Sequence, residues 1–303
     1  MGILIDQHTA ILVQGITGRE AGHMVRESLE YGARIVAGIT PGKGGLKVEG
    51  LPVYDCVRNA VQQHGVNATV ISVPPFAVLE AALEAIENRI KLLVIVTERV
   101  PRRDVAEILS FASEQGATVI GPNSLGVISP GVTKVGSIGG SAENTNRSFT
   151  PGGVGVISRS GGMTCEIGNM LTQNGIGQST CVSVGGDPLI GSNFTELFRL
   201  YQDDPETKAV VLLGEPGGGM EEEFAEFYAA QRRPKPVAAF IAGKFVEQMP
   251  GTRFGHAAVI VQEGRGGAGS KMQVLRKAGV YVADELSQLP NILREVLGNG
   301  HVH

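Results

Sequence analysis

The feature that most constrains the fold of this 303-residue chain is a regular alternation of short apolar segments and longer amphipathic segments, joined by glycine-rich turns. In the first part of the chain, the apolar segments expected to be strands lie at 10–14, 34–38, 68–73, 91–97 and 117–120. Strands that alternate with helices at this spacing form a parallel sheet with right-handed crossovers. The sequence therefore predicts a Rossmann-like domain over residues 1–129.

The same alternation resumes after residue 153. The strands expected there lie at 154–158, 178–184, 208–213, 236–242 and 280–282. The helices expected between and after them lie near 162–174, 193–202, 221–231, 268–278 and 285–297. This pattern predicts a second doubly wound α/β domain, flavodoxin-like, over residues 154–303. Residues 130–153 are rich in Gly, Ser, Thr and Asn, and we expect them to form an interdomain segment.

Composition excludes several classes of protein. The chain has 26 Lys and Arg against 30 Asp and Glu, so it offers no basic stripe for nucleic acid. No apolar run reaches membrane-spanning length and the N-terminus lacks a signal-peptide pattern, so we expect no membrane association. Cys56, Cys165 and Cys181 are too widely spaced for a disulfide framework or a metal motif. We therefore expect no metal site in this chain and a reducing, cytoplasmic location.

The turn after the first expected strand has the features of a phosphate-binding loop. Gly15 and Gly18 allow backbone N–H groups to approach a ligand closely, and the N-terminus of the following helix favours negative charge. A purely structural turn is the alternative for this loop alone. Gln14 stands where the first glycine of the dinucleotide fingerprint belongs, and the second strand does not end in the acid that binds an NAD ribose. An NAD-linked dehydrogenase is therefore disfavoured.

Three other strand ends extend this possible ligand site. The second strand runs into a glycine turn, 40–45, whose Lys43 suits a further phosphate. The two turns together favour a nucleotide with an extra phosphate, such as coenzyme A (CoA) with its 3′-phosphate. The segments 96–98 and 121–124 also follow strands, and ligands of open α/β sheets bind outside the carboxyl ends of the strands. Ordinary turn chemistry is the alternative for both segments.

A histidine in the second half is a candidate for covalent chemistry. His256 lies between a glycine and an alanine, so a reagent can approach its ring. Two glycine-rich loops, 158–162 and 214–219, follow expected strands, and the first of them is an expected anion site. Glu215 in the second loop is suited to hydrogen-bond one imidazole nitrogen and leave the other as nucleophile. We hypothesise that His256 is a phosphoryl carrier; the alternatives are a packed or hydrogen-bonded loop histidine and a capping or surface role for Glu215.

The chain lacks a recognisable site for a nucleoside triphosphate. The segment 264–271 resembles a Walker A loop, but Ser270 precedes Lys271, whereas the motif requires Lys before Ser or Thr. A chain with a candidate phosphate acceptor and no triphosphate site is expected to work with a partner chain.

Motifs along nearly the whole chain resemble those of the α subunit of succinate–CoA ligase. The matching stretches are 3–6, 14–18, 40–45, 121–123, 158–161, 175–182, 185–188, 191–194 and 255–257. The resemblance implies a CoA-binding Rossmann domain followed by a ligase domain. It also implies the reaction of an acid, CoA and a nucleoside triphosphate to acyl-CoA, nucleoside diphosphate and phosphate, through a phosphohistidine and an acyl phosphate.

The resemblance also implies roles for particular residues and a partner. His256 is expected to be the phosphohistidine and Glu215 the acid that orients it. The residues expected to bind CoA are Thr17, Gly18, Arg19, Glu20, Lys43, Val96, Thr97 and Glu98. A β subunit of ATP-grasp fold is expected to bind ATP or GTP together with Mg²⁺, in an αβ or α₂β₂ assembly.

The chain departs from the family in the loop expected to bind phosphate and the small carboxylic acid substrate. This loop comprises Ser160, Gly161, Gly162 and Cys165. Gly162 replaces the family's first threonine, and Cys165 replaces the tyrosine associated with the acid. Because the smaller residue at 165 leaves room, malate, citrate or another dicarboxylate is an alternative to succinate. A non-catalytic CoA-binding protein is a further alternative, which the retention of His256 and Glu215 disfavours.

Overall fold

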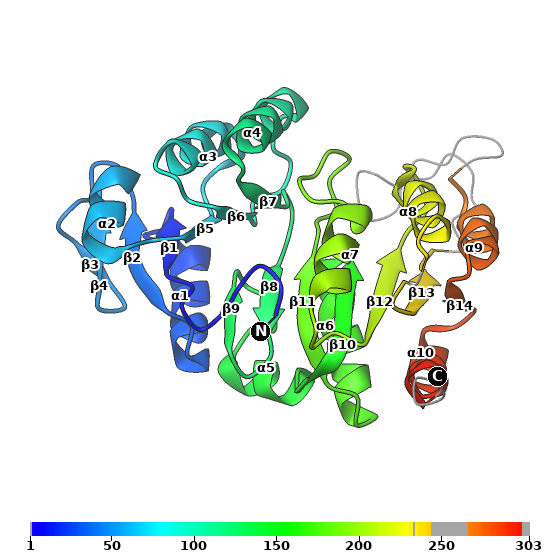
Figure 1. Cartoon of the computed structure of the whole chain (residues 1–303). Coiled ribbons are helices and arrows are strands. Elements are labelled where there is room, and N and C mark those ends of the chain that lie inside the picture. Colours follow the sequence, from blue (N-terminus) through cyan, green and yellow to red (C-terminus); the bar gives the residue numbers. More distant parts are fainter. Residues whose placement is uncertain (1, 233, 244–265, 299–303) are drawn as a thin grey trace.

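The computed structural model describes residues 2–232, 234–243 and 266–298. In these ranges the chain forms two seven-stranded sheets, which lie side by side in Figure 1. None of the helices in the described ranges is long and apolar enough to cross a membrane. His256 lies outside these ranges, so its expected role stays a prediction.

The first sheet has the strand order of a Rossmann domain. Its strands are β1 (Ile11–Gln14), β2 (Ile35–Ile39), β3 (Lys47–Val48), β4 (Leu51–Tyr54), β5 (Ala68–Ile71), β6 (Leu92–Ile95) and β7 (Thr118–Ile120). They are arranged β3-β4-β2-β1-β5-β6-β7, and only the pair β3–β4 is antiparallel. Numbered along the chain, the parallel strands follow the order 3-2-1-4-5-6, which is the Rossmann order. The fold expected for the first half is confirmed.

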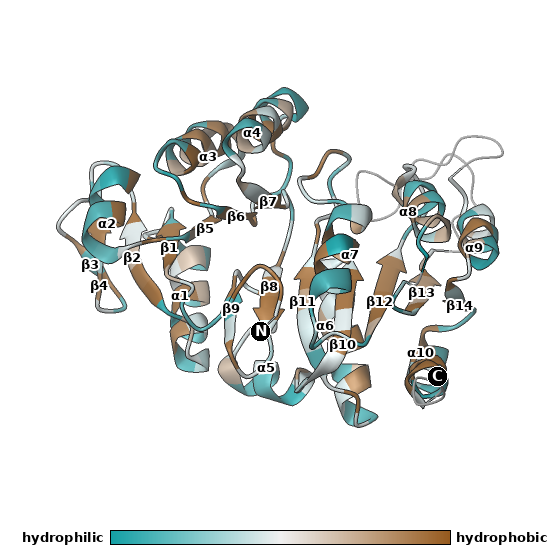
Figure 2. Cartoon of the chain, viewed as in Figure 1, coloured by the Kyte–Doolittle hydropathy of each residue, from teal (hydrophilic) through white to brown (hydrophobic). Residues whose placement is uncertain are grey.

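Helices cover this sheet on both faces. They are α1 (Arg19–Tyr31), α2 (Val57–His64), the 3-10 helix η1 (Pro75–Ala77), α3 (Val78–Glu87) and α4 (Arg102–Gln115). Because both faces are covered, β1, β5 and β6 are buried at every residue, which explains their continuous apolar runs. Figure 2 shows these strands as hydrophobic, whereas the helices carry both hydrophobic and hydrophilic residues. α1 ends at Gly32, whose positive φ of 98° suits a residue without Cβ.

The second sheet has a flavodoxin-like core of five parallel strands. Its strands are β8 (Gly126–Ser129), β9 (Thr133–Val135), β10 (Pro151–Ser158), β11 (Gln178–Ser183), β12 (Ala209–Gly214), β13 (Val237–Ile241) and β14 (Tyr281–Ala283). Their order is β14-β13-β12-β10-β11-β8-β9. From β10 to β14, numbered along the chain, this is the order 2-1-3-4-5 read in reverse. The flavodoxin-like fold expected for the second half is therefore confirmed as well.

The helices of the second half are α5 (Ala142–Ser148), α6 (Gly161–Gln173), α7 (Phe194–Asp203), α8 (Met220–Ala229), α9 (Ala268–Lys277), the 3-10 helix η3 (Leu286–Gln288) and α10 (Leu289–Gly298). All of them except α5 fall where the sequence predicts helices. α7 begins with a capping box, in which Asn193 and Glu196 each accept a hydrogen bond from the other's backbone N–H.

Residues 130–153 do not form the irregular interdomain segment that the sequence predicts. β8 and β9 form an antiparallel hairpin on the edge of the second sheet, where β8 pairs with β11, and α5 follows. The second sheet therefore already begins at residue 126, before the expected boundary at 129. The glycines that make this stretch resemble a linker have a structural role. Gly126 and Gly136 have φ of 106° and 109°, and a Cβ on either would overlap the backbone of the other strand.

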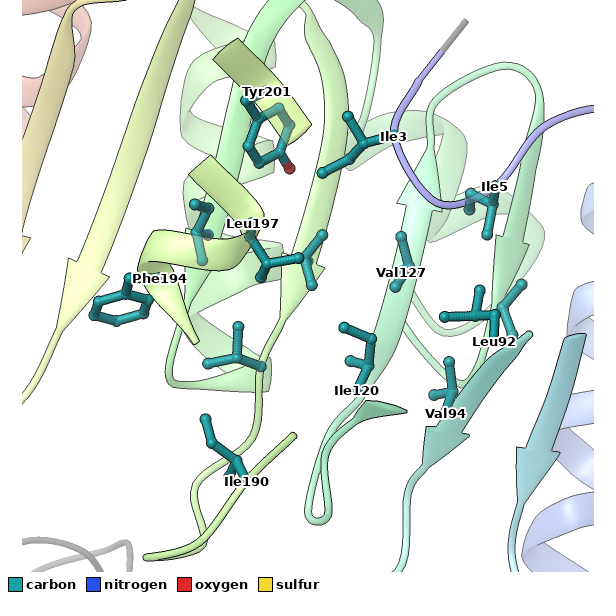
Figure 3. Close-up of a cluster of buried hydrophobic side chains, with 14 of the residues drawn as sticks. Ile3, Ile5, Leu92, Val94, Ile120, Val127, Ile190, Phe194, Leu197 and Tyr201 are labelled. Atoms are coloured by element: carbon teal, nitrogen blue, oxygen red, sulfur yellow. The ribbon is translucent and has the colours of Figure 1, made fainter. Parts of the chain in front are cut away.

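The start of the chain connects the two domains. The Ile3 N–H donates to Thr180 Oγ1 of β11 over 3.1 Å, and Ile3 and Ile5 are buried. In Figure 3, Ile3 lies toward Tyr201 and Leu197 of the second domain, and Ile5 lies toward Leu92 of the first. One hydrophobic cluster thus runs through both domains.

Candidate functional site

A cavity of about 900 Å³ lies in the first domain, beside the turn that follows β1. Its walls come from this turn, the first two turns of α1 and the segment 42–49. Five of the predicted CoA-binding residues line it: Thr17, Gly18, Arg19, Glu20 and Lys43. The two glycine turns that the sequence singled out therefore meet at one cavity.

Local geometry joins the two turns. Lys43 Nζ donates to Thr17 Oγ1 over 3.3 Å, and Thr17 Oγ1 donates to Thr40 Oγ1 over 3.2 Å. Gly18 precedes α1 and has no side chain with which to cap it. The N-terminus of α1 therefore presents its backbone N–H groups and its positive dipole end to this cavity.

The cavity wall carries several basic side chains. Arg19, Arg26 and Lys43 line it, together with His23. Arg26 is paired with Glu49, another lining residue, over 2.8 Å, and this hydrogen bond raises the pKa of the guanidinium. These side chains suit a ligand with several phosphate groups.

The other predicted CoA contacts are not among the residues that line this cavity. Residues 96–98 follow β6, which is separated from β1 by β5, at the same carboxyl edge of the sheet. Thr97 Oγ1 donates to Val73 O over 2.7 Å, and Thr97 O accepts from the Asn123 N–H over 2.9 Å. The Glu98 side chain is 60% exposed and lies 3.7 Å from Arg99. A role for Val96, Thr97 and Glu98 in binding CoA stays a prediction.

A second constellation lies at the carboxyl edge of the second sheet. β10 and β12 are neighbours, with Ser158 opposite Leu213, so the loops that follow them leave the sheet side by side. Arg159 in the first loop and Glu215 in the second form an ion pair with 3.1 Å between Nε and Oε1. Both side chains are nearly buried. The structure thus brings together the two loops that the sequence assigned to phosphoryl chemistry.

The loops that follow β11 and β7 also contribute residues to this constellation. Arg159 Nη2 donates to Asp187 O over 3.3 Å, and Asp187 follows β11. Asn123 Nδ2 donates to Asp187 Oδ1 over 3.1 Å. Asn123 follows β7 of the first domain and has a positive φ of 55°. Loops from both domains therefore converge on Arg159 and Glu215.

The predicted phosphate loop has a defined geometry at the start of α6. Ser160 caps the helix by accepting from the Met163 N–H over 3.4 Å. A Cβ at Gly161 would overlap the Leu125 side chain, whereas a Cβ at Gly162 would meet no atom within 4 Å. The loop is therefore closely packed at residue 161 and open at residue 162.

Cys165 lies one turn further along α6 and is half-buried. Burial raises the pKa of its thiol. A hydrogen bond with the Gly139 backbone and the charge of Lys134 act in the opposite direction, but burial has the larger effect. The side chain packs beside the apolar cluster that contains Ile128 and Ile167. The thiol therefore stays protonated at neutral pH.

Lys134 on β9 is a buried lysine that the sequence analysis did not single out. Its Nζ donates to Ile138 O over 3.2 Å and to Gly140 O over 2.7 Å, and it lies 5.7 Å from the centre of the Tyr31 ring. Burial lowers the pKa of the ammonium from 10.5 to about 8. No sequence signal separates this lysine from a surface lysine.

Glu221 and Lys271 are two further residues that the sequence analysis did not assign to the site. Glu221 Oε1 accepts from the Glu215 N–H over 3.0 Å, and Lys271 Nζ donates to Gly217 O over 2.6 Å. Lys271 also forms a buried ion pair with Glu221. The burial of Lys271 could have been predicted from the sequence, because Lys271 falls on the apolar face of α9 with Ala268, Met272 and Leu275. Among the residues that the structure describes, no group of three or more His, Cys, Asp or Glu side chains is placed to hold a metal ion.

Comparisons with known families match both halves of the chain. Residues 6–99 match the family model of the CoA binding domain, and residues 157–281 match that of CoA-ligase. The matched regions cover more than half of the chain and contain the cavity and the constellation around Glu215, respectively.

Curated relatives align over almost the full length. The α subunit of the ADP-forming succinate–CoA ligase of Methanothermobacter thermautotrophicus is 46% identical over 98% of this chain and 97% of its own. The α subunit 2 of the same enzyme from Archaeoglobus fulgidus is 45% identical over 98% of this chain and 100% of its own. A subunit of an ADP-forming sulfoacetate–CoA ligase from Acholeplasma sp. is 41% identical over 98% of both chains.

Solved structures share the arrangement of both domains. ATP citrate lyase from Methanothrix soehngenii, in complex with citrate and coenzyme A, superposes with a TM-score of 0.91 at 27% identity over 99% of this chain. This chain spans about half of the ATP citrate lyase chain, 52%. A dinucleotide-forming acetyl-coenzyme A synthetase from Ca. Korarchaeum cryptofilum, at 20% identity and a TM-score of 0.70, shows the same fold. The two matched domains and the full-length relatives above 40% identity show that this chain belongs to the succinate–CoA ligase α-subunit family, whose members are ADP-forming acid–thiol ligases.

Proposed function

We propose that this subunit takes part in converting succinate, CoA and ATP or GTP into succinyl-CoA, nucleoside diphosphate and phosphate. In this reaction a phosphoryl group passes from the nucleotide to His256 and then to a carboxylate oxygen of the acid. The sulfur of CoA attacks the acyl carbon of the resulting acyl phosphate, and phosphate leaves. The full-length relatives named succinate–CoA ligase support this choice of reaction.

The cavity in the first domain is the proposed CoA site. Its volume of about 900 Å³ is within the range of small-molecule sites. Arg19 and Lys43 are the side chains proposed to bind phosphate groups, with the N-terminus of α1. Thr17, Gly18 and Glu20 form the loop beside them, and residues 96–98 are proposed to contact another part of the same ligand.

The loops of the second domain are the proposed phosphoryl site. Glu215 is proposed to orient the imidazole of His256 by accepting a hydrogen bond from one ring nitrogen, which leaves the other nitrogen nucleophilic. The 158–162 loop and the N-terminus of α6 are proposed to hold the phosphoryl group. The observation that carries this proposal is the convergence of the loops after β10, β11 and β12 on the Arg159–Glu215 pair.

A partner chain completes the proposed enzyme. We propose a β subunit of ATP-grasp fold that binds the nucleoside triphosphate with Mg²⁺, in an αβ or α₂β₂ assembly, in the cytoplasm. The relatives are themselves named as α subunits, which supports a partner.

The first experiment is phosphorylation of the co-purified α–β enzyme with ATP or GTP labelled on the γ-phosphate. We expect an acid-labile, base-stable label on the α subunit, which succinate and CoA together remove with formation of succinyl-CoA. We expect the His256→Asn variant of the α subunit to take up no label. His8→Asn serves as the matched control, because His8 is an exposed histidine near the N-terminus. An assembled enzyme that takes no label with either nucleotide contradicts the proposal and favours a CoA-binding protein without ligase chemistry.

A related acid is the second candidate substrate. The open space at Gly162 and the small side chain of Cys165 leave room for an acid that is bulkier than succinate or differently substituted. A relative named sulfoacetate–CoA ligase is 41% identical to this chain. The labelled enzyme is therefore also treated with CoA and malate, citrate or sulfoacetate in turn. Faster loss of label with one of these acids than with succinate identifies it as the better substrate.

A further inference from the structure

The loop that carries Glu215 is held by groups outside the proposed reaction. It follows β12 and leads into α8, and α9 packs against α8 (Figure 1). Three hydrogen bonds hold this loop, and two of them come from charged side chains, Glu221 of α8 and Lys271 of α9. A fourth contact joins these two side chains to each other.

These contacts hold the backbone of the loop at Glu215 and Gly217. Glu221 Oε1 accepts from the Glu215 N–H over 3.0 Å. Lys271 Nζ donates to Gly217 O over 2.6 Å, and the Gly217 N–H donates to Gly266 O over 2.8 Å. The fourth contact is the ion pair between Lys271 and Glu221.

The strand end is shaped to admit the Glu221 carboxylate. A Cβ at Gly214, the last residue of β12, would overlap Glu221 Oε1. The side chain of Lys271 has no exposed surface and that of Glu221 is 2% exposed. Glu222 lies 3.8 Å from the same ammonium, so two carboxylates face one buried cation.

A gain in folding stability does not by itself explain a buried ion pair such as Lys271–Glu221. Burial raises the pKa of Glu221, and the charge of Lys271 opposes this shift. Removing two charges from water costs several kcal/mol per ion, and well-packed neutral residues of similar volume often stabilise a core as well or better. The pair does, however, hold the Glu215 N–H and the Gly217 carbonyl, which apolar residues of that size do not.

We infer that Lys271 and Glu221 are positioning residues that hold the 214–219 loop so that Glu215 keeps the geometry required for phosphoryl transfer. The inference rests on the proposed function of Glu215. Neither residue touches the reacting atoms in this scheme. A displacement of about 1 Å at a reacting group can lower a rate on the order of 100-fold, so the loss of this clamp has a measurable effect.

The test uses the assembled α–β enzyme with Lys271→Met, Glu221→Gln and the double variant. The single variants leave one buried partner unpaired and are expected to lose stability as well as activity. The double variant removes both charges with little change in volume, so its melting temperature is expected to return toward that of wild type. Its kcat is expected to remain on the order of 10- to 100-fold low, because Gly217 O has lost its donor. The KM for CoA is expected to be unchanged, because the proposed CoA cavity lies in the other domain.

Arg276→Ala is the matched control. Arg276 lies on α9, as Lys271 does, and its ion pair with Asp284 is exposed. It is expected to leave kcat at the wild-type value. A double variant that regains both melting temperature and wild-type kcat would show a purely structural pair and overturn the inference. A wild-type enzyme that forms neither phosphoenzyme nor acyl-CoA overturns the proposed function and the inference together, whereas active wild type with equally active variants overturns only the inference.

Discussion

Arg159 Nε lies 3.1 Å from Glu215 Oε1, and the two side chains are only 6% and 11% exposed. A carboxylate has two oxygens that each accept hydrogen bonds, so the pairing with Arg159 does not prevent Glu215 from accepting an imidazole N–H as well. The pair also links the loops after β10 and β12, so the position of Glu215 depends on Arg159.

Arg159→Met is expected to destabilise the protein, because it leaves the Glu215 carboxylate nearly buried without this cation. The expected loss is about 3 kcal/mol in the free energy of unfolding, measured by urea denaturation. Combining it with Glu215→Gln should restore most of the loss. Equal stability of Arg159→Met and wild type would show that the pair contributes nothing.

Lys43→Ala is expected to weaken CoA binding, because Lys43 lines the cavity in the first domain. Loss of one charged hydrogen bond to a phosphate corresponds to a rise of about 10-fold in KM or Kd for CoA. Lys47→Ala removes an exposed lysine of β3 that does not line the cavity, and should leave both constants unchanged. A similar effect of both substitutions would point to net charge as the cause.

Gly161→Ala and Gly162→Ala are expected to differ although the residues are adjacent. A Cβ at 161 would overlap Leu125, which predicts a loss of about 1–3 kcal/mol. A Cβ at 162 meets nothing within 4 Å, and alanine restricts the unfolded chain more than glycine does, which predicts a gain of up to about 1 kcal/mol. Thermal melts of the two variants check this order, and the reverse order would contradict the packing at Leu125.

Lys134 predicts a pH dependence of stability. Its pKa is about 8 in the folded protein, against 10.5 for an unperturbed lysine. Between these values the unfolded chain binds a proton that the folded protein does not, so this lysine makes the fold more stable as pH rises from 8 to 10. Below pH 8 both states are protonated and the contribution is flat. The groups that act on this ammonium are Glu27 and Cys165, with the Tyr31 ring beside it.

The measurement compares wild type with Lys134→Met, so that the contributions of all other groups to the pH dependence of stability cancel. The free energy of unfolding of wild type minus that of Lys134→Met should rise across this window, with a slope approaching about 1.4 kcal/mol per pH unit. Lys47→Met, which removes an exposed lysine, controls for the change in net charge. A difference that stays constant from pH 7 to 10 would mean that the ammonium is not desolvated.

The parallel strands and their helices were predictable because buried strands leave continuous apolar runs and the helices keep one apolar face. β8 and β9 were not predictable, because they are short and flanked by glycines. β8 is defined by pairing with β11 about fifty residues later, and β9 by pairing with β8. The two glycine turns around the cavity were likewise predictable, because Gly18 and Lys43 lie in recognisable sequence patterns. Lys134 was not, because lysine is almost always a surface residue and its burial depends on tertiary packing.

The contact between Ile3 and Thr180, 177 residues apart, has a consequence for the order of events during synthesis. At typical translation rates of 5–20 residues per second, Thr180 is made roughly 10–35 s after Ile3. The first sheet needs only the chain up to β7, so it has the time to form while the second sheet is still being translated. Residues 3–5 precede every strand of the first sheet in the chain, yet they can reach their native contacts only after β11 has been made.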